Sequence, residues 1–136
     1  MRQLTATLLV FHCLAYATVG HALQCNKINN DEAFKAAAQV VIGRFNSVEA
    51  VGDSETRYKI TFDVLDVLKG PLSETITLTL DKERYLDPDA YIAGVKYLMF
   101  LEADQTEIRI CEKISMLEGP NAQWYAAWQD KERGLK

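Results

Sequence analysis

The chain has 136 residues, with 15 Lys and Arg against 19 Asp and Glu, so its net charge is −4 at neutral pH. This length suits one domain with its own core and leaves no room for a second. The acidic balance argues against nucleic-acid binding, which depends on basic groups that replace counterions at phosphates, and the interspersed charges indicate a solvated surface.

The start of the chain is typical of a signal peptide. Arg2 precedes an apolar run, and small residues lead up to a cleavage site that we place after Ala22. The run is shorter than the ~20 residues that a membrane-spanning helix needs, which disfavours a retained anchor. A lipid anchor on Cys25 is disfavoured too. We therefore expect a leader over residues 1–22, one domain over residues 23–136 without a membrane span, and secretion to the periplasm or the extracellular space.

Removal of this leader removes both histidines, His12 and His21, and brings the net charge to about −5. A chain without histidine cannot assemble a Ser-His-Asp or Cys-His centre or a histidine-ligated zinc site. The two remaining cysteines, Cys25 and Cys111, are most simply interpreted as one disulfide, with free thiols or a bridge to another chain as alternatives. Such a bridge would close a loop of roughly 86 residues and contribute about 4.5 kcal/mol in the chain-entropy model.

The first predicted elements are a helix and a long strand. Residues 30–38 predict a short helix with Asn30 as its N-cap and carboxylates in its first turn, at the positive end of the helix dipole. We expect Phe34 to pack against the next element. Residues 39–51 are rich in β-branched and aromatic side chains, which predicts a strand with a bend at Gly43.

The second predicted strand covers residues 57–68. Its alternation places four large side chains on one face: Tyr58, Ile60, Phe62 and Val64. The phase then slips by one, so that Leu65 and Val67 are expected to take over the inward positions. A slip of this kind indicates a β-bulge.

Three more strands and a helix follow. Residues 75–80 alternate, residues 95–101 form a near-continuous apolar run expected to be the most central strand, and residues 106–112 predict the last strand. Residues 121–133 predict a C-terminal helix with basic residues near its end. A mainly β domain of five strands with bulge and glycine bends predicts a small, closed or partly closed antiparallel barrel with flanking helices. A two-sheet sandwich is the alternative, although it usually has seven or more strands.

Three stretches carry motifs of a known family: residues 38–44 (AQVVIGR), 62–71 (FDVLDVLKGP) and 91–100 (YIAGVKYLMF). With Cys25 and Cys111 at the places of the first and last cysteines, they resemble the netrin-like domain. More narrowly, they resemble the tissue inhibitors of metalloproteinases and their microbial relatives. The resemblance implies a five-stranded OB-like antiparallel barrel and a protein partner, which in the inhibitors is an extracellular metalloprotease.

The chain departs from those inhibitors at the expected mature N-terminus. The family inhibitors begin with Cys-x-Cys, and the amine and carbonyl of the first cysteine chelate the zinc of the protease. Here Cys25 is followed by Asn26 and Lys27, so the second cysteine is missing, and Leu23 and Gln24 precede it. Inhibition of a metalloprotease is therefore the alternative rather than the leading hypothesis.

Four carboxylates cluster in a polar segment: Asp81, Glu83, Asp87 and Asp89. Two of them could act as a glycosidase-like pair, or several could hold a hard cation, although their spacing fits no EF-hand loop. Solvation of a loop is the preferred interpretation. We thus expect no catalytic residue, no metal and no cofactor, and a small carboxylate-dependent hydrolase is the third hypothesis.

The aromatic residues Trp124, Tyr125 and Trp128 lie at helical spacing, and the two tryptophans share one face. Such a group forms either an exposed platform for a ligand or an anchor for its own helix, and packing is the preferred interpretation. The leading hypothesis is a secreted, non-catalytic binding module of netrin-like type that engages a protein partner. The candidate partner-binding residues are Leu23, Gln24, Cys25, Asn26, Trp124, Tyr125 and Trp128.

Overall fold

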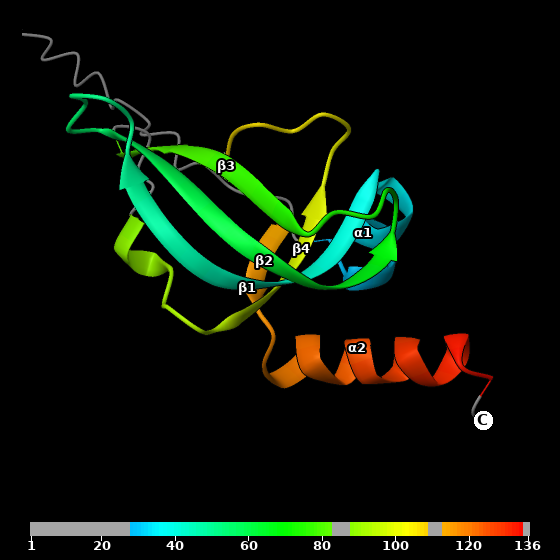
Figure 1. Ribbon diagram of the computed structural model, residues 1–136. Coiled ribbons are helices and arrows are strands. Elements are labelled where there is room, and N and C mark those ends of the chain that lie inside the picture. The colour runs from blue at the N-terminus through cyan, green and yellow to red at the C-terminus, as the bar shows by residue number, and fades with distance from the viewer. Residues whose placement is uncertain (1–27, 83–87, 109–112, 135–136) are drawn as a thin grey trace, which may run out of the picture.

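A five-stranded antiparallel sheet with a helix at each end of the chain makes up the fold (Figure 1). The computed structural model describes residues 28–82, 88–108 and 113–134. The elements in chain order are α1 (Asn30–Ala36), β1 (Gln39–Ala50), β2 (Arg57–Lys69), β3 (Thr75–Asp81), the 3₁₀ turn η2 (Pro88–Ala90), β4 (Lys96–Leu101), β5 (Lys113–Met116) and α2 (Gly119–Glu132). The sheet order is β3-β2-β1-β4-β5. No helix in the described part of the chain is long and apolar enough to cross a membrane.

The predicted bulge in β2 is confirmed. The pairing with β1 passes from Ile42 opposite Asp66 directly to Gly43 opposite Val64, so Leu65 has no partner in the ladder. The side chain of Leu65 is 44% exposed, and the prediction that it takes an inward position is therefore wrong. The extra residue at a bulge bends the strand and turns its own side chain out of the alternation.

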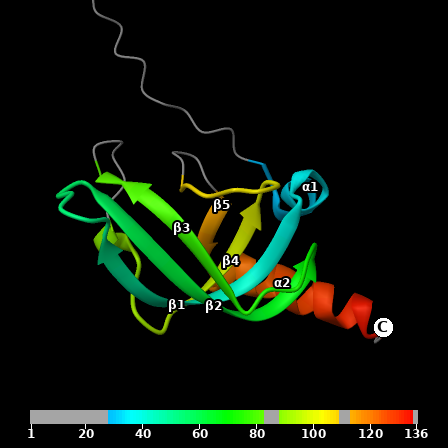
Figure 2. The same ribbon diagram turned by 45° about the horizontal axis from the view of Figure 1, so that its top comes forward.

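Strand β1 is curved along its length (Figure 2). At Gly43 its backbone lies close against side chains of the two neighbouring strands. A Cβ atom at this position would lie 2.8 Å from the Sδ of Met99 and 3.2 Å from the Cβ of Phe62. Only a residue without a side chain allows so close an approach of backbone to packed side chains. The glycine is thus required by packing inside the curve of the sheet.

Two apolar cores lie on the two faces of the sheet. The inner core fills its concave side and confirms the alternation predicted for β2 and β3; its buried members are Val41, Phe45, Ile60, Phe62, Ile76, Leu78, Leu80, Tyr97, Met99, Leu101 and Ile108. The outer core lies between the sheet and the helices; its buried members are Ala33, Ala37, Val40, Ile42, Leu68, Leu98 and Phe100. Strands β1 and β4 contribute to both cores. The outer core also includes residues of α1 and α2, so both helices cover the outer face of these two strands.

The prediction that residues 95–101 form the most central strand is wrong, because β1 occupies the middle of the sheet and β4 lies beside it. The apolar run has a different cause. Tyr97 and Met99 point into the inner core while Leu98 and Phe100 point into the outer core. A strand that is buried on both faces has a near-continuous apolar sequence wherever it lies in the sheet.

The last predicted strand is described only in part. Within the described residues the last strand is β5, at Lys113–Met116; residues 109–112 of the predicted strand at 106–112 fall outside the described residues. Residues Thr106 and Ile108 instead bond to β3, since Thr79 N donates to the Thr106 carbonyl and Ile108 N donates to the Thr79 carbonyl, both at 2.8 Å. This contact is an isolated parallel bridge. The described strands form one sheet that is not closed into a barrel.

Both predicted helices exist, with shifted ends. Asn29, and not Asn30, caps α1, since its Oδ1 accepts a hydrogen bond of 2.8 Å from the backbone N of Glu32. The helix stops at Ala36 because Ala37 is already extended. α2 begins at Gly119, and its Pro120 suits the first helical turn, where a backbone N–H has no partner within the helix.

Candidate binding cleft between the helices

Polar side chains join α2 to α1. Trp124 Nε1 donates to Asp31 Oδ1 at 2.8 Å, and Asn30 Nδ2 donates to Asn121 Oδ1 at 3.0 Å. These two bonds link residues 93 and 91 positions apart in the chain. They fix the first half of α2 beside α1.

A third bond joins α2 to the sheet. The Tyr125 hydroxyl donates to Asp66 Oδ2 at 2.5 Å and accepts from Gln129 Nε2 at 2.8 Å. Burial, followed by the hydrogen bond and the negative charge of Asp66, raises the pKa of Tyr125 from 10.0 to about 12, against a smaller opposite effect of Arg133. The phenol therefore stays protonated and keeps donating across the physiological range.

Aromatic rings form the contact between the two helices. The ring of Phe34 on α1 lies 5.9 Å from Trp124 and 6.5 Å from Trp128, and Trp124 lies 5.8 Å from Phe100 beneath it. These separations fall within the 4.5–7 Å typical of aromatic pairs. The preferred packing interpretation is thus right for Trp124, Tyr125 and Trp128, which all pack against the outer core. No residue of α2 is fully buried, however.

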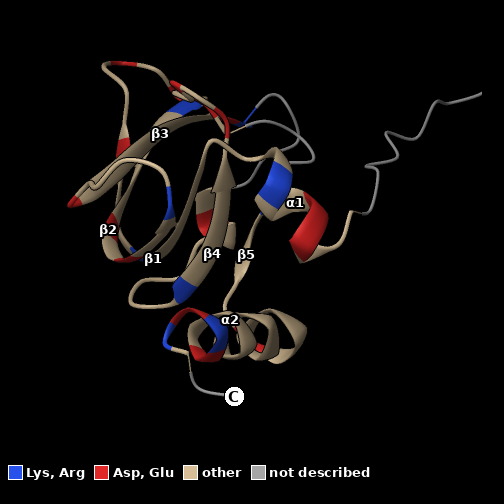
Figure 3. Cartoon of the chain, turned by 90° about the vertical axis from the view of Figure 1, so that its right-hand side faces the viewer, with Lys and Arg blue, Asp and Glu red and all other residues tan. Residues whose placement is uncertain are grey.

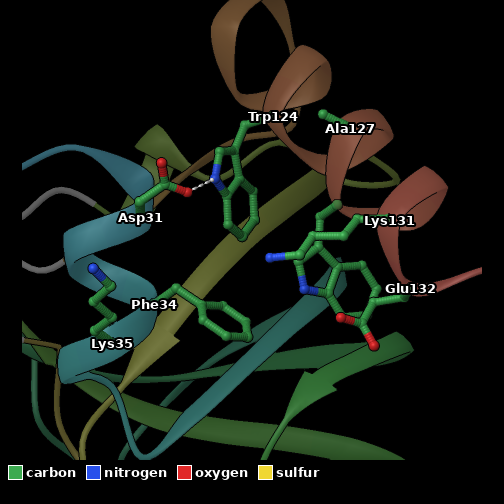
Figure 4. A pocket seen from close by; sticks show the side chains of 8 residues that line it. Asp31, Phe34, Lys35, Trp124, Ala127, Lys131 and Glu132 are labelled. Atoms are coloured by element: carbon green, nitrogen blue, oxygen red, sulfur yellow. Dashed lines mark hydrogen bonds between the residues drawn. The ribbon is translucent and has the colours of Figure 1, made fainter. Parts of the chain in front are cut away.

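The partial burial leaves an open cleft between the helices, here called the helix cleft (Figure 4). Its volume is about 490 Å³, within the 300–1,000 Å³ of small-molecule sites. The lining residues are Asp31, Phe34, Lys35, Trp124, Ala127, Trp128, Lys131 and Glu132. Both helices carry acidic and basic residues (Figure 3), so the aromatic walls of the cleft are rimmed by charges of both signs.

Of the predicted partner-binding residues, Trp124 and Trp128 line the helix cleft, whereas Tyr125 does not. Leu23, Gln24 and the adjacent Cys25 and Asn26 lie outside the described residues, as does Cys111, so the disulfide stays a prediction.

The contribution of α1 to the helix cleft was not predicted. Asp31, Phe34 and Lys35 are three and four residues apart and therefore lie on one face of this helix, which was the available signal. Their position opposite α2 depends on how the two helices dock. That arrangement is set by contacts between distant parts of the chain, which helical spacing alone does not specify.

The carboxylate cluster gains no support as a reaction centre. Asp81 and Asp89 are described, whereas Glu83 and Asp87 are not. Within the described residues no group of three or more His, Cys, Asp or Glu side chains is placed to hold a metal ion. A smaller cleft of about 270 Å³ includes Asp81 where β3 meets residues 106–108, and Arg57 lies 3.9 Å from Glu107 there.

Comparison of the sequence with protein-family models and with curated proteins finds no match.

Proposed function

We propose that the chain is an exported, non-catalytic binding module that engages a protein partner through the helix cleft. The observation that carries this proposal is the partly exposed aromatic surface of Trp124 and Trp128 around an open cleft. Tryptophan and tyrosine are enriched among the few residues that carry most of the binding energy at protein interfaces. A fixed cleft also lowers the entropy lost on binding, because its walls are already ordered.

Hydrogen bonds keep the walls in place. The indole of Trp124 is held by Asp31, and Tyr125, which stacks on Trp128 with an angle of 12° between the rings, is held by Asp66. The rings therefore have little freedom to collapse into the cleft. This supports a preformed site rather than an accidental gap between two helices.

For the scaffold we propose an OB-like barrel of the netrin-like kind. The parallel bridge between Thr79 of β3 and Glu107 supports it, because this bridge brings the chain after β4 to the free edge of β3. A closed barrel has no free strand edge. In the order β3-β2-β1-β4-β5 the edge of β3 must be covered for the barrel to close, and the bridge lies at this edge.

The test is a capture experiment with three forms of the immobilised protein: wild type, Ala127→Arg and Ala126→Arg. Both alanines are exposed neighbours on α2, but only Ala127 lines the helix cleft. Arginine suits a helix, so neither change disturbs folding. We expect a protein from the native compartment to bind wild type and Ala126→Arg but not Ala127→Arg. Equal capture by all three forms, or capture by none, would contradict the proposal.

A further inference from the structure

The backbone of β5 alternates between bonds to β4 and groups that face away from it. Leu117 N donates to the Lys96 carbonyl at 2.8 Å, and the register continues without a shift through Met116 and Ile114. Residues directly opposite each other in an antiparallel pair alternate between bonded and non-bonded. The N–H and C=O groups of Ile114 and Met116 therefore point to the outer edge of the sheet.

Three of these four outward groups have no hydrogen-bond partner in the described part of the chain: the N–H and C=O of Ile114 and the N–H of Met116. The fourth, the Met116 carbonyl, accepts from Asn121 Nδ2 at 3.0 Å. The opposite edge differs, because Thr79 of β3 bonds through its N–H and its C=O to residues 106–108. Figure 3 shows β5 on the outer side of β4, between α1 and α2. Among the described strands, β5 thus presents the edge that is open to a further strand.

β5 lacks the features that usually protect an edge strand from pairing. Such strands carry charged side chains, a proline or a bulge at the edge. β5 has no proline and no register shift, and its one charged residue is Lys113. Lys113 Nζ donates to the Ile28 carbonyl at 2.9 Å and lies 5.5 Å from the centre of the Phe100 ring in the outer core. The ammonium is therefore held against the outer core and does not guard the edge.

A groove runs from the Met116 end of β5 along the start of α2, and we call it the edge groove. Its volume is about 510 Å³, and its lining residues are Ser115, Met116, Glu118, Gly119, Pro120 and Asn121. Met116 is 37% exposed and offers an apolar contact. Glu118 is the only charged residue of this lining and forms no ion pair within residues 28–82, 88–108 and 113–134. The groove thus favours a basic side chain beside an apolar one.

We propose that the outer edge of β5 accepts an extended segment of a partner protein as an additional antiparallel strand, with a basic side chain of that segment paired to Glu118. One residue of the segment exchanges two hydrogen bonds with Ile114, and the residue two positions before it accepts from the N–H of Met116. An extended peptide supplies these groups because its backbone repeats every two residues, over about 6.8 Å. The edge is separate from the helix cleft, so this inference does not depend on the function proposed above.

A second copy of this chain fits the edge less well. A two-fold axis at Ser115 would pair Ile114 of each copy with Met116 of the other, which requires both Met116 carbonyls as acceptors. Each of these carbonyls already accepts from Asn121, and the segment proposed above does not need it. A two-fold axis at Ile114 forms only two bonds within β5. The hydrogen bonds of the edge therefore favour a segment of a different protein.

The probe is the peptide acetyl-Lys-Thr-Val-Thr-Val-Thr-amide, whose β-branched residues favour an extended chain. In the proposed pairing its last valine lies opposite Ile114 and its lysine lies near Glu118. Two matched peptides carry one backbone N-methyl group each, on the last valine or on the threonine between the valines. The first loses the donor to the Ile114 carbonyl, whereas the second loses an N–H that faces away from β5. A further peptide has glutamate in place of lysine.

Amide hydrogen exchange of the ¹⁵N-labelled protein reports directly on the edge. In the free protein the amides of Ile114 and Met116 should exchange faster than that of Ser115, which bonds to β4. Saturation with the probe should slow the exchange of both at least about tenfold, with a Kd of about 1 mM or tighter. The peptide methylated on the threonine should bind equally well, and the peptide methylated on the last valine at least about tenfold more weakly.

The role of Glu118 is tested by exchange of charges. Its side chain makes no capping bond to α2, so replacement leaves the helix intact. Glu118→Gln should weaken the probe about two- to fivefold, as expected for an exposed ion pair, and Glu118→Lys should prefer the glutamate peptide over the lysine peptide. Glu49→Gln, an exposed carboxylate of the β1–β2 hairpin, is the control and should leave binding unchanged.

Several results would overturn the proposal. Slow exchange of the Ile114 and Met116 amides in the free protein would show that the edge is already covered. Equal binding of the two methylated peptides, no saturable binding, or an unchanged peptide preference in Glu118→Lys would contradict strand pairing at this edge with a basic segment. Self-association that the probe reverses would show that a second copy occupies the edge. A shift of the Trp128 indole without protection of β5 would place the peptide in the helix cleft instead.

Discussion

Replacement of Tyr125 by Phe tests how α2 is held against the sheet. The change removes the hydroxyl that donates to Asp66 at 2.5 Å and accepts from Gln129 at 2.8 Å, and it keeps the ring that stacks on Trp128. A hydrogen bond to a charged group contributes about 1.5–3 kcal/mol. Because this pair is only partly buried, we expect the free energy of unfolding to fall by about 1–2 kcal/mol at pH 7.

The same hydroxyl makes stability depend on alkaline pH. The folded state raises the pKa of Tyr125 from 10.0 to about 12, so it holds the proton more tightly than the unfolded chain does. The contribution is therefore complete below pH 10 and is lost as the pH rises towards 12. The shift would correspond to about 2.7 kcal/mol for a fully enclosed group. Solvent screens this partly open phenol, and we expect about 1 kcal/mol.

The assay is urea denaturation at pH 7, 9 and 11, followed by far-ultraviolet circular dichroism. Wild type and Tyr125→Phe should differ most at pH 7 and least at pH 11. The control is Tyr58→Phe, whose hydroxyl donates to the Glu55 carbonyl at 3.0 Å in an exposed position, and it should cost at most about 0.5 kcal/mol. The reasoning is refuted if Tyr125→Phe matches wild type at pH 7, or if the gap stays constant up to pH 11.

Three further changes test the scaffold. Gly43→Ala should lower the free energy of unfolding by about 1–3 kcal/mol in urea denaturation, because the new Cβ would lie 2.8 Å from the Met99 sulfur. An unchanged free energy of unfolding would show that the curved sheet shifts to make room for the methyl group. Asn29→Ala should cost about 1 kcal/mol by thermal unfolding through loss of the cap on α1, and an unchanged midpoint would contradict that assignment. The purified protein should contain a Cys25–Cys111 bridge, seen as a linked peptide pair in a non-reducing digest; two free thiols would contradict it, and reduction should cost about 4.5 kcal/mol.

Much of the sheet could be predicted because one face of β2 and β3 packs inward. Burial on a single face imposes a period of two, and the break in that period located the bulge at Leu65. The order of strands could not be read in this way. Strand β4 is apolar on both faces, and its sequence does not show which strand lies beside it. The bond from Thr79 to residues 106–108 depends on the curvature of the whole sheet.

The candidate site was predicted only on its α2 side. Spacing along the chain places Trp124 and Trp128 on one helix face, and this much needs no tertiary information. The partner face on α1 depends on bonds between residues more than 90 positions apart, such as Trp124 to Asp31. The position of the cap was missed for a related reason. Asn29 and Asn30 are both suitable caps, and Asn30 instead bonds to Asn121 on α2.

The central claim is that the helix cleft is the binding surface, and nuclear magnetic resonance of the ¹⁵N-labelled protein tests it most directly. The spectrum contains two indole signals, and that of Trp128 belongs to the N–H without an acceptor in the described part of the chain. Addition of the captured partner should shift the Trp128 indole and the amides of α1 and α2 in wild type and in Ala126→Arg, but not in Ala127→Arg. Shifts confined to the β1–β2 hairpin or the β3 edge, with the Trp128 indole unmoved, would contradict the claim.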